Sequence, residues 1–409
     1  MREMKDSGIE WIGDIPQTWI VKKFKYTHRN SNVGESIDKE YWTNNEKETI
    51  FYTAGANSIY CSYKLFPVWK YTTVNDLLLA RNGTPYVYFP YSNSMYTDHI
   101  IRVSLNNEYC KKYIGYCLQQ SIYSEVVDSV SIATWSISIW DKQSLPIPPF
   151  KEQQLIATFL DKKCSEIDTL ISDIQQQIET LEQYKRSVIT EAVTKGLNPD
   201  VEMRDSGIEW IGKIPKHWIT HPLYYYFGER KNKNALGLET NLLSLSYGKI
   251  IRKDINSNGG LLPESFNTYN IVEKDDIIIR PTDLQNDKRS LRTGIVREHG
   301  IITSAYIAMK AIKAISPEYF HYLLHAYDVM KVFYNMGNGV RQGLNFSEFS
   351  RLMVLEPPIE EQNAIVLFLS EKCSEIDLAI AEKRQQIETI EEYKKSLIFE
   401  YVTGKKEVI

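Results

Sequence analysis

The chain has 409 residues, a formal net charge of −4, 43% hydrophobic residues and 24% charged residues. This composition is typical of a folded globular protein of two or three domains, and it excludes a fibrous or fully disordered chain. No apolar run reaches the roughly 18 residues that a membrane helix needs, and the charged start of the chain lacks the apolar core of a signal peptide. Five scattered cysteines without a CxxC pair favour reduced thiols, so we expect a cytoplasmic protein.

The first element is a short segment that occurs twice. The letters DSGIEWIG stand at 6–13 and again at 205–212, and the match extends over 4–20 and 203–219 with an offset of 199. Its apolar and aromatic side chains are suited to packing, which indicates a scaffold segment. These side chains are Trp11, Ile12, Pro16 and Trp19 with their partners Trp210, Ile211, Pro215 and Trp218.

A lobe of short β-type runs and turn signals follows. In NDLLLARNG, at 75–83, an acidic turn precedes an aliphatic strand, and an arginine then enters a loop. An arginine in such a place is able to bind the O6 and N7 atoms of guanine. The candidate DNA-binding residues of this lobe are Lys64, Arg81, Asn82, Thr84 and Trp135.

The next stretch predicts one long helix. Pro148 and Pro149 suit its start, Glu152 suits its first turn, and Gly196 suits its end. The interval is roughly 45 residues, or about 65 Å at 1.5 Å per residue. Apolar residues recur with an average spacing near 3.5, which predicts a coiled-coil seam. The seam consists of Ile167, Ile171, Ile174, Ile178, Leu181 and Val188.

The helix also has a second copy. Residues 148–196 align without gaps with 357–405 at an offset of 209, and over half of the positions are identical. The seam recurs there, so we expect the two helices to pack on each other as an antiparallel coiled coil. The recurring seam residues are Ile376, Ile380, Ile387, Ile390 and Leu397.

Charge separates the helices from the lobes. Residues 151–200 and 359–409 carry net charges of −3 and −4, whereas 1–150 are neutral and 201–358 carry +3. Acidic helices bind phosphate poorly, so we expect their outer faces to bind protein. The candidate partner-binding residues, kept in both copies, are Gln176, Gln177, Glu179 and Tyr184 with Gln385, Gln386, Glu388 and Tyr393.

The second lobe shows no visible sequence similarity to the first, except that KDDIIIRPTD at 274–283 repeats the plan of strand, arginine and loop. Arg280 keeps the offset of 199 from Arg81. RPTDLQNDKRSLR at 280–292 and GNGVRQGLNF at 337–346 are polar loops with groups that suit base edges. The candidate DNA-binding residues are Arg280, Gln285, Asn286, Lys288, Arg289, Arg292, Arg341 and Gln342.

Motifs for catalysis are near misses. IPPF at 147–150 is close to the [DNS]PP[YFW] motif of amino-methyltransferases, but Ile147 stands where an amide or carboxylate is needed. No FxGxG-type loop for S-adenosylmethionine and no GxxxxGK[ST] loop is present. HYLLH at 321–325 lacks the glutamate of HExxH. We therefore expect no catalytic residue and no metal site in this chain.

The duplicated MKDSGIEWIG-type segment, the PP…EQ helix start and the SEID…QQIET helix together resemble the specificity (S) subunits of type I restriction-modification systems, also called the HsdS family. The resemblance implies an α+β fold with two globular target recognition domains, joined by two long antiparallel helices in a pseudo-twofold repeat. It implies domain boundaries of 1–147 and 198–356 for the recognition domains, and of 148–197 and 357–409 for the conserved helices.

The resemblance also implies the partners. Each recognition domain would read one half of a bipartite site on double-stranded DNA, and the helices would set the spacer. Two modification (M) subunits would bring S-adenosylmethionine, and restriction (R) subunits would bring ATP and Mg²⁺, so this chain itself would hold no cofactor. Two alternatives stay open: a stand-alone DNA-binding regulator without methyltransferase partners, and a protein scaffold built on the helices.

Overall fold

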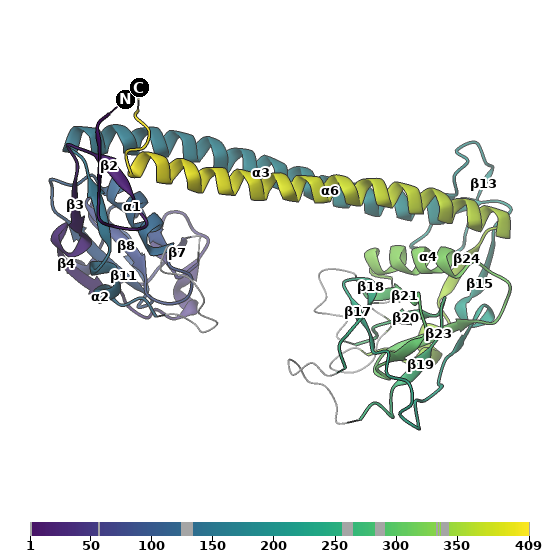
Figure 1. Ribbon diagram of the computed structural model, residues 1–409. Coiled ribbons are helices and arrows are strands. Elements are labelled where there is room, and N and C mark those ends of the chain that lie inside the picture. Colours follow the sequence, from purple (N-terminus) through teal and green to yellow (C-terminus); the bar gives the residue numbers. More distant parts are fainter. Residues whose placement is uncertain are drawn as a thin grey trace. The chain divides into compact units, whose positions relative to one another are not determined.

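The computed structural model describes residues 2–55, 58–123, 134–255, 265–282, 291–332, 334, 336 and 343–408. The chain divides into two compact units. Unit 1 holds Met1–Gln175 and Arg384–Ile409, and unit 2 holds Gln176–Lys383. Each unit therefore contains one lobe together with a part of both long helices (Figure 1).

The two long helices are α3 (Phe150–Lys195) and α6 (Ile359–Val402). Each begins directly after a pair of prolines. Proline lacks a backbone N–H, and this costs no hydrogen bond here because the first N–H groups of a helix have no partner within the helix. A glycine with positive φ follows each end: Gly196 at +77° and Gly404 at +73°. The predicted seam residues are all buried or half-buried, which confirms the inward face of both helices.

Within each unit the two helices run antiparallel. In unit 1, Lys394 pairs with Asp168 at 2.6 Å, and the rings of Phe159 and Tyr401 lie 4.4 Å apart. In unit 2, Lys185 pairs with Asp377 at 2.7 Å. Lys185 and Lys394 are repeat partners, and so are Asp168 and Asp377. The same contact is thus made twice with the roles of the helices exchanged, as a pseudo-twofold repeat requires.

The repeated DSGIEWIG letters form the same hairpin in each unit. β1 (Met4–Asp6) pairs with β2 (Asp14–Pro16), and β13 (Met203–Asp205) pairs with β14 (Lys213–Pro215) in the same register. Both glycines of each copy have a φ between +67° and +71°, a conformation that disfavours any side chain. Local backbone geometry therefore accounts for the two glycines of the motif.

An indole docks each hairpin onto the frame. Trp19 and Trp218 are at most 1% exposed, and their Nε1 groups donate to Glu152 Oε2 at 3.1 Å and Glu361 Oε2 at 2.9 Å. A Cβ on Gly404 would lie 2.5 Å from a carbon of Pro16, so the chain after α6 also packs too closely for a side chain. The scaffold role of this segment is confirmed, although Trp210 remains 41% exposed.

A glutamine in the first turn of each helix ties the lobe to the frame. Gln153 accepts from the backbone N–H of Cys110 and donates to Pro148 O, both at 2.9 Å. Gln362 makes the same two bonds, with Ser316 and Pro357, at the same distances. The PP…EQ motif is therefore a structural junction at the helix start, as expected for a segment without catalytic chemistry.

The two lobes share one topology despite their dissimilar sequences. In both, a four-stranded sheet places the last strand in sequence between the first and the second. In the first lobe the order is β4 (His28–Val33), β11 (Ile100–Leu105), β8 (Asp76–Ala80), β9 (Val87–Tyr88). In the second lobe it is β16 (Phe227–Glu229), β23 (Ile307–Ala311), β20 (Ile277–Ile279), β21 (Thr293–Ile295).

The remaining shared elements follow in the same sequence order in both lobes. They are β3 (Ile20–Lys23) with β12 (Ser144–Ile147), α1 (Lys111–Tyr123) and α2 (Ile137–Asp141), which correspond to β15 (Ile219–Pro222) with β24 (Met353–Glu356), α4 (Pro317–Val329) and α5 (Phe346–Phe349). The lobes differ in their additional strands. These are β5 (Trp42–Thr43), β6 (Thr49–Tyr52), β7 (Ile59–Cys61) and β10 (Met95–Tyr96) in the first, and the pairs β17 (Leu243–Ser246) with β18 (Lys249–Arg252) and β19 (Asn270–Val272) with β22 (Gly300–Ile302) in the second.

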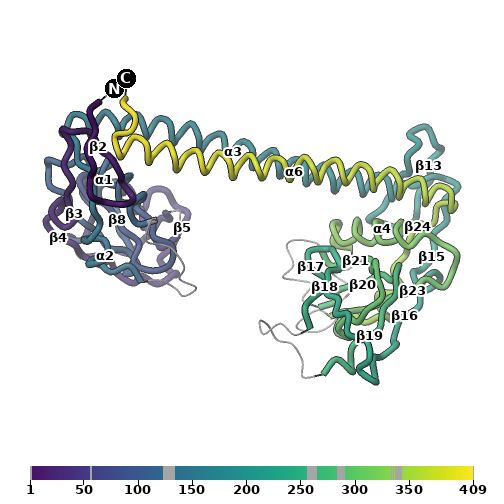
Figure 2. The backbone as a smooth tube through the Cα atoms, in the orientation of Figure 1, coloured from purple at the N-terminus to yellow at the C-terminus, as the bar shows by residue number. Residues whose placement is uncertain are grey.

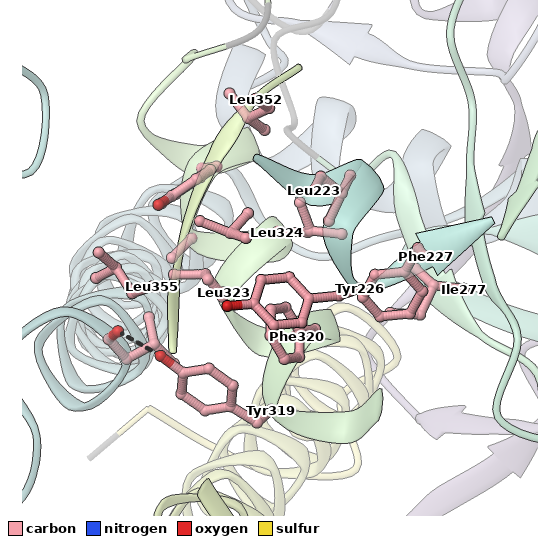
Figure 3. Packing of buried hydrophobic residues seen from close by; sticks show 14 of the residues in the cluster. Leu223, Tyr226, Phe227, Ile277, Tyr319, Phe320, Leu323, Leu324, Leu352 and Leu355 are labelled. Carbon is pink, nitrogen blue, oxygen red and sulfur yellow. Dashed lines mark hydrogen bonds between the residues drawn. The ribbon is translucent and has the colours of Figure 1, made fainter. Parts of the chain in front are cut away.

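Aromatic side chains fill the core between the lobe helix and the frame. In unit 2 the rings of Tyr226 and Phe227 lie 5.0 and 5.4 Å from that of Phe320 (Figure 3). The hydroxyl of Tyr319 donates to Val193 O of α3 at 3.2 Å, and that of Tyr113 donates to Val402 O of α6 at 3.0 Å. Each lobe helix thus binds the end of the long helix that belongs to the other repeat.

The two chain ends meet in unit 1. Arg2 forms ion pairs with Glu407 and Glu152, and the first and last described residues lie side by side in both views (Figures 1 and 2).

The indole–carboxylate contact allows a stability test in two equivalent places. Trp19→Phe and Trp218→Phe each remove an N–H donor from a buried junction and leave a carboxylate without that partner. We expect each substitution to lower the free energy of unfolding by about 1.5–3 kcal/mol, measured by urea denaturation. Trp69→Phe, at a side chain 63% exposed, is the control and should stay within about 0.5 kcal/mol of the wild type. Equal stability of all three variants would contradict the docking role.

A pH dependence follows from two histidines of α4. They line a cavity of about 700 Å³ in unit 2. Burial, reinforced by the neighbouring His325 and Arg297, lowers the pKa of His321 to about 3. Burial, with Lys185 and Arg186, lowers the pKa of His325 to about 4. Both rings are therefore neutral in the folded protein at neutral pH.

Because these folded-state pKa values lie below the unfolded value near 6.5, stability is complete above about pH 6.5 and falls as the pH drops towards 4. The slope should stay below about 1.4 kcal/mol per pH unit for each histidine, because each ring takes up at most one proton. Urea denaturation at several pH values measures it. A His321→Asn/His325→Gln variant should show a shallower dependence, and an unchanged slope would contradict this assignment.

Candidate nucleic-acid interface

An exposed arginine ends the central strand of each lobe. Arg81 directly follows the buried strand β8, and Arg280 directly follows the buried strand β20. β8 pairs antiparallel with β11, and β20 pairs antiparallel with β23. Each arginine therefore lies beside the start of the neighbouring strand. The predicted placement of both arginines at a strand end is confirmed.

Polar groups gather around Arg81 in the first lobe. Its backbone N–H donates to His99 O at 2.9 Å, and its Nη1 donates to Asp98 O at 3.3 Å. The Nδ2 of Asn82 lies 2.8 Å from Nδ1 of His99, and Thr84 is exposed nearby in the chain. Arg81, Asn82 and His99 thus form a hydrogen-bonded cluster on the surface.

Trp135 has a different place from the one predicted. Its side chain is 7% exposed and belongs to the core of unit 1, so it is not available to a base. Its backbone N–H donates to Arg81 O and its Nε1 donates to Gly83 O, both at 2.6 Å. The prediction of a DNA contact at Trp135 was wrong, because the ring is used to hold the loop that follows Arg81.

Arg292 requires the same correction in the second lobe. Its side chain is 3% exposed, and its Nη1 donates to the carbonyls of Arg280 and Thr282. Its guanidinium also lies over the ring of Tyr334 at 5.5 Å. A guanidinium buried in this way supports the loop after Arg280 from the inside and is not exposed to a phosphate or base.

The remaining candidates fall into two groups. Lys64 is exposed, but its ammonium pairs with Glu48 at 2.7 Å, which reduces the positive charge it presents. Six other predicted residues lie outside the described residues: Gln285, Asn286, Lys288, Arg289, Arg341 and Gln342. The base-edge role of these six stays a prediction.

The sequence analysis did not single out His99. The sequence offered only a weak indication of His99: the polar run TDH stands at 97–99, directly before the residues that form β11. Only the pairing of β8 with β11 brings this run beside Arg81.

The outer faces of the long helices carry the candidate partner-binding residues. All eight are exposed in the structure. The side-chain Oε1 of Gln177 accepts from Lys383 Nζ on the other helix within unit 2. Tyr184 and Tyr393, at equivalent positions of the two repeats, are 50% and 58% exposed. Exposed aromatic rings at equivalent positions suit a partner that binds twice.

The described part of the chain contains neither a candidate metal site nor a candidate membrane-spanning helix. Among those residues, no three His, Cys, Asp or Glu side chains are grouped so that they could hold a metal ion. In the same part, no helix has both the length and the apolar character needed to cross a bilayer.

Residues 14–180 match the family described as "Type I restriction modification DNA specificity domain". The type I restriction enzyme MjaVIII specificity subunit of Methanocaldococcus jannaschii is 24% identical over 359 residues, which cover 83% of this chain and 78% of that protein. A candidate specificity subunit of the same organism, MjaX, is 26% identical over 267 residues, or 64% of this chain and 59% of that protein. The chain thus aligns with less than two thirds of the length of MjaX.

A solved chain from work on complex assembly and conformational transition of the type I R-M system has the same fold. Its TM-score is 0.65 at 10% sequence identity, and the match covers 96% of this chain and 99% of that chain. The chain thus contains a type I restriction modification DNA specificity domain over residues 14–180, is similar in sequence to type I restriction enzyme specificity subunits, and shares the fold of a solved chain from such a system.

Proposed function

We propose that this chain is the DNA-sequence specificity subunit of a type I restriction-modification complex, and that each lobe reads one half of a bipartite site. The observation that carries the proposal is the pair of exposed arginines, Arg81 and Arg280, at the same strand end of two lobes that otherwise differ. An arginine at such a place is suited to bidentate contact with guanine. Two different lobes on one repeated frame suit two different half-sites.

The long helices would set the spacer between the half-sites. Half-sites on one face of a duplex lie about one turn apart, roughly 34–36 Å. A helix of 46 residues, such as α3, is about 69 Å long at 1.5 Å per residue, which is ample for this purpose. Because the frame contacts recur in each unit, the two lobes would meet the duplex through equivalent faces.

Catalysis would lie in the partners. Two modification subunits would carry S-adenosylmethionine, and restriction subunits, where present, would use ATP and Mg²⁺; this chain would bind no cofactor of its own. The carbonyls of Pro148 and Pro357 accept from Gln153 and Gln362 at the two helix starts, which supports a structural role for both proline pairs. All five cysteines are free, which suits an assembly in the cytoplasm.

The test is co-expression with the cognate modification subunits in a methylation-free host, followed by single-molecule sequencing of methyladenine. We expect a split motif with two short specific halves around a fixed gap. Exchange of residues 220–356 for the corresponding lobe of a relative should change one half only, and Arg280→Ala should relax one base of that half by about 1–3 kcal/mol. An assembled complex that methylates nothing would contradict the proposal and would favour a stand-alone regulator.

The partner surface has its own test. Tyr184→Ala and Tyr393→Ala each remove an exposed ring from one of two equivalent positions. We expect each single variant to retain one modification subunit and the double variant to retain none, as measured by native mass spectrometry of the purified complex. The control is Thr169→Ala, an exposed α3 position that is not kept in the second repeat, where Leu378 stands. Full assembly of the double variant would show that the partner binds elsewhere.

A further inference from the structure

We propose that His99 is a specificity-determining residue of the first lobe, and that it reads base edges together with Arg81 and Asn82. The inference rests on the proposed function, because it names side chains that would read the first half-site. His99 lies in a turn, distant in sequence from Arg81, and the pairing of β8 with β11 brings the two together. All the contacts that define the cluster lie within unit 1.

Hydrogen bonds hold the cluster on both sides. On one side the backbone N–H of Arg81 donates to His99 O at 2.9 Å, and Arg81 Nη1 donates to Asp98 O at 3.3 Å. On the other side Trp135 donates to the carbonyls of Arg81 and Gly83. Gly83 has a φ of +76°, so the loop turns at a residue without a side chain. Side chains held in this way lose little further freedom on binding, which favours specific contact over flexible contact.

The pair of Asn82 and His99 has a defined hydrogen-bonding pattern. Asn82 Nδ2 lies 2.8 Å from His99 Nδ1, so the amide donates and Nδ1 accepts. A neutral His99 then carries its proton on Nε2, which becomes a donor towards an acceptor of a base, such as guanine N7 or O6 or thymine O4. The Oδ1 atom of Asn82 is left as an acceptor for the amino group of adenine or cytosine.

The second lobe has other residues at the two equivalent positions. Pro281 follows Arg280 where Asn82 follows Arg81, and Tyr306 precedes β23 where His99 precedes β11. Proline has no side-chain amide, and Tyr306 packs against the core of its lobe. The two lobes therefore share the arginine and differ in its neighbours, which provides a physical basis for two different half-sites.

The experiment uses the full chain in the assembled complex and compares methyladenine motifs. His99→Ala and Asn82→Ala should each relax the same base position or an adjacent one in one half-site, with roughly a tenfold loss of preference there. The other half-site and the gap should stay unchanged. The matched control is Asn75→Ala, an exposed amide at the opposite end of β8, which should leave the motif as in the wild type.

A second pair of variants tests the positioning of the loop. Trp135→Phe keeps the ring in the core but removes the donor to Gly83 O, so it should broaden the same half-site. Trp140→Phe removes an indole bond to Ala80 O, which lies within the strand, and should leave the motif intact. Unchanged motifs in the His99, Asn82 and Trp135 variants, with a split motif in the wild type, would overturn this inference alone. A wild-type complex that yields no split motif would overturn the proposed function together with it.

Discussion

The rest of the architecture depends on one repeated junction, in which a buried indole donates to a glutamate in the first turn of a long helix. Trp19 with Glu152 and Trp218 with Glu361 make this contact at 3.1 and 2.9 Å. It fixes the hairpin of the DSGIEWIG segment against the helix start, where the adjacent glutamine ties in the lobe helix. The indoles are buried and their N–H groups need an acceptor, which the half-buried carboxylates supply in both repeats.

A frame of this kind separates stability from specificity. The contacts of the frame involve hairpins, helix starts and helix ends, and among the described residues none of those named above uses the loops that follow β8 and β20. The lobes keep the strand order that carries Arg81 and Arg280 and differ in sequence and in their additional strands. These loops can therefore change in sequence while the junctions of the frame stay the same, as the proposed function requires.

The two corrected residues show how the loops are held. Trp135 and Arg292 are polar-tipped side chains that end inside the protein, and each donates to carbonyls of the loop that follows the strand-end arginine. One lobe uses an indole that precedes α2 and the other a guanidinium that precedes β21, so the carbonyls after the strand-end arginine are bound from different elements and with different chemistry. The polar stretch 280–292 suggested a surface position for Arg292, and Trp135 was predicted to contact DNA; the burial of both side chains reverses that interpretation.

Repeats, helix starts, helix ends and the apolar seam could be predicted from the sequence, because they depend on local backbone preferences and on the period of apolar residues along one helix. The strand-end arginines could be predicted for the same reason. The shared topology of the lobes, the burial of Trp135 and Arg292, and the meeting of Arg81 with His99 were decided only by tertiary structure. Those features join residues far apart in sequence through strand pairing and core packing, and no local pattern encodes which distant strand will pair with which.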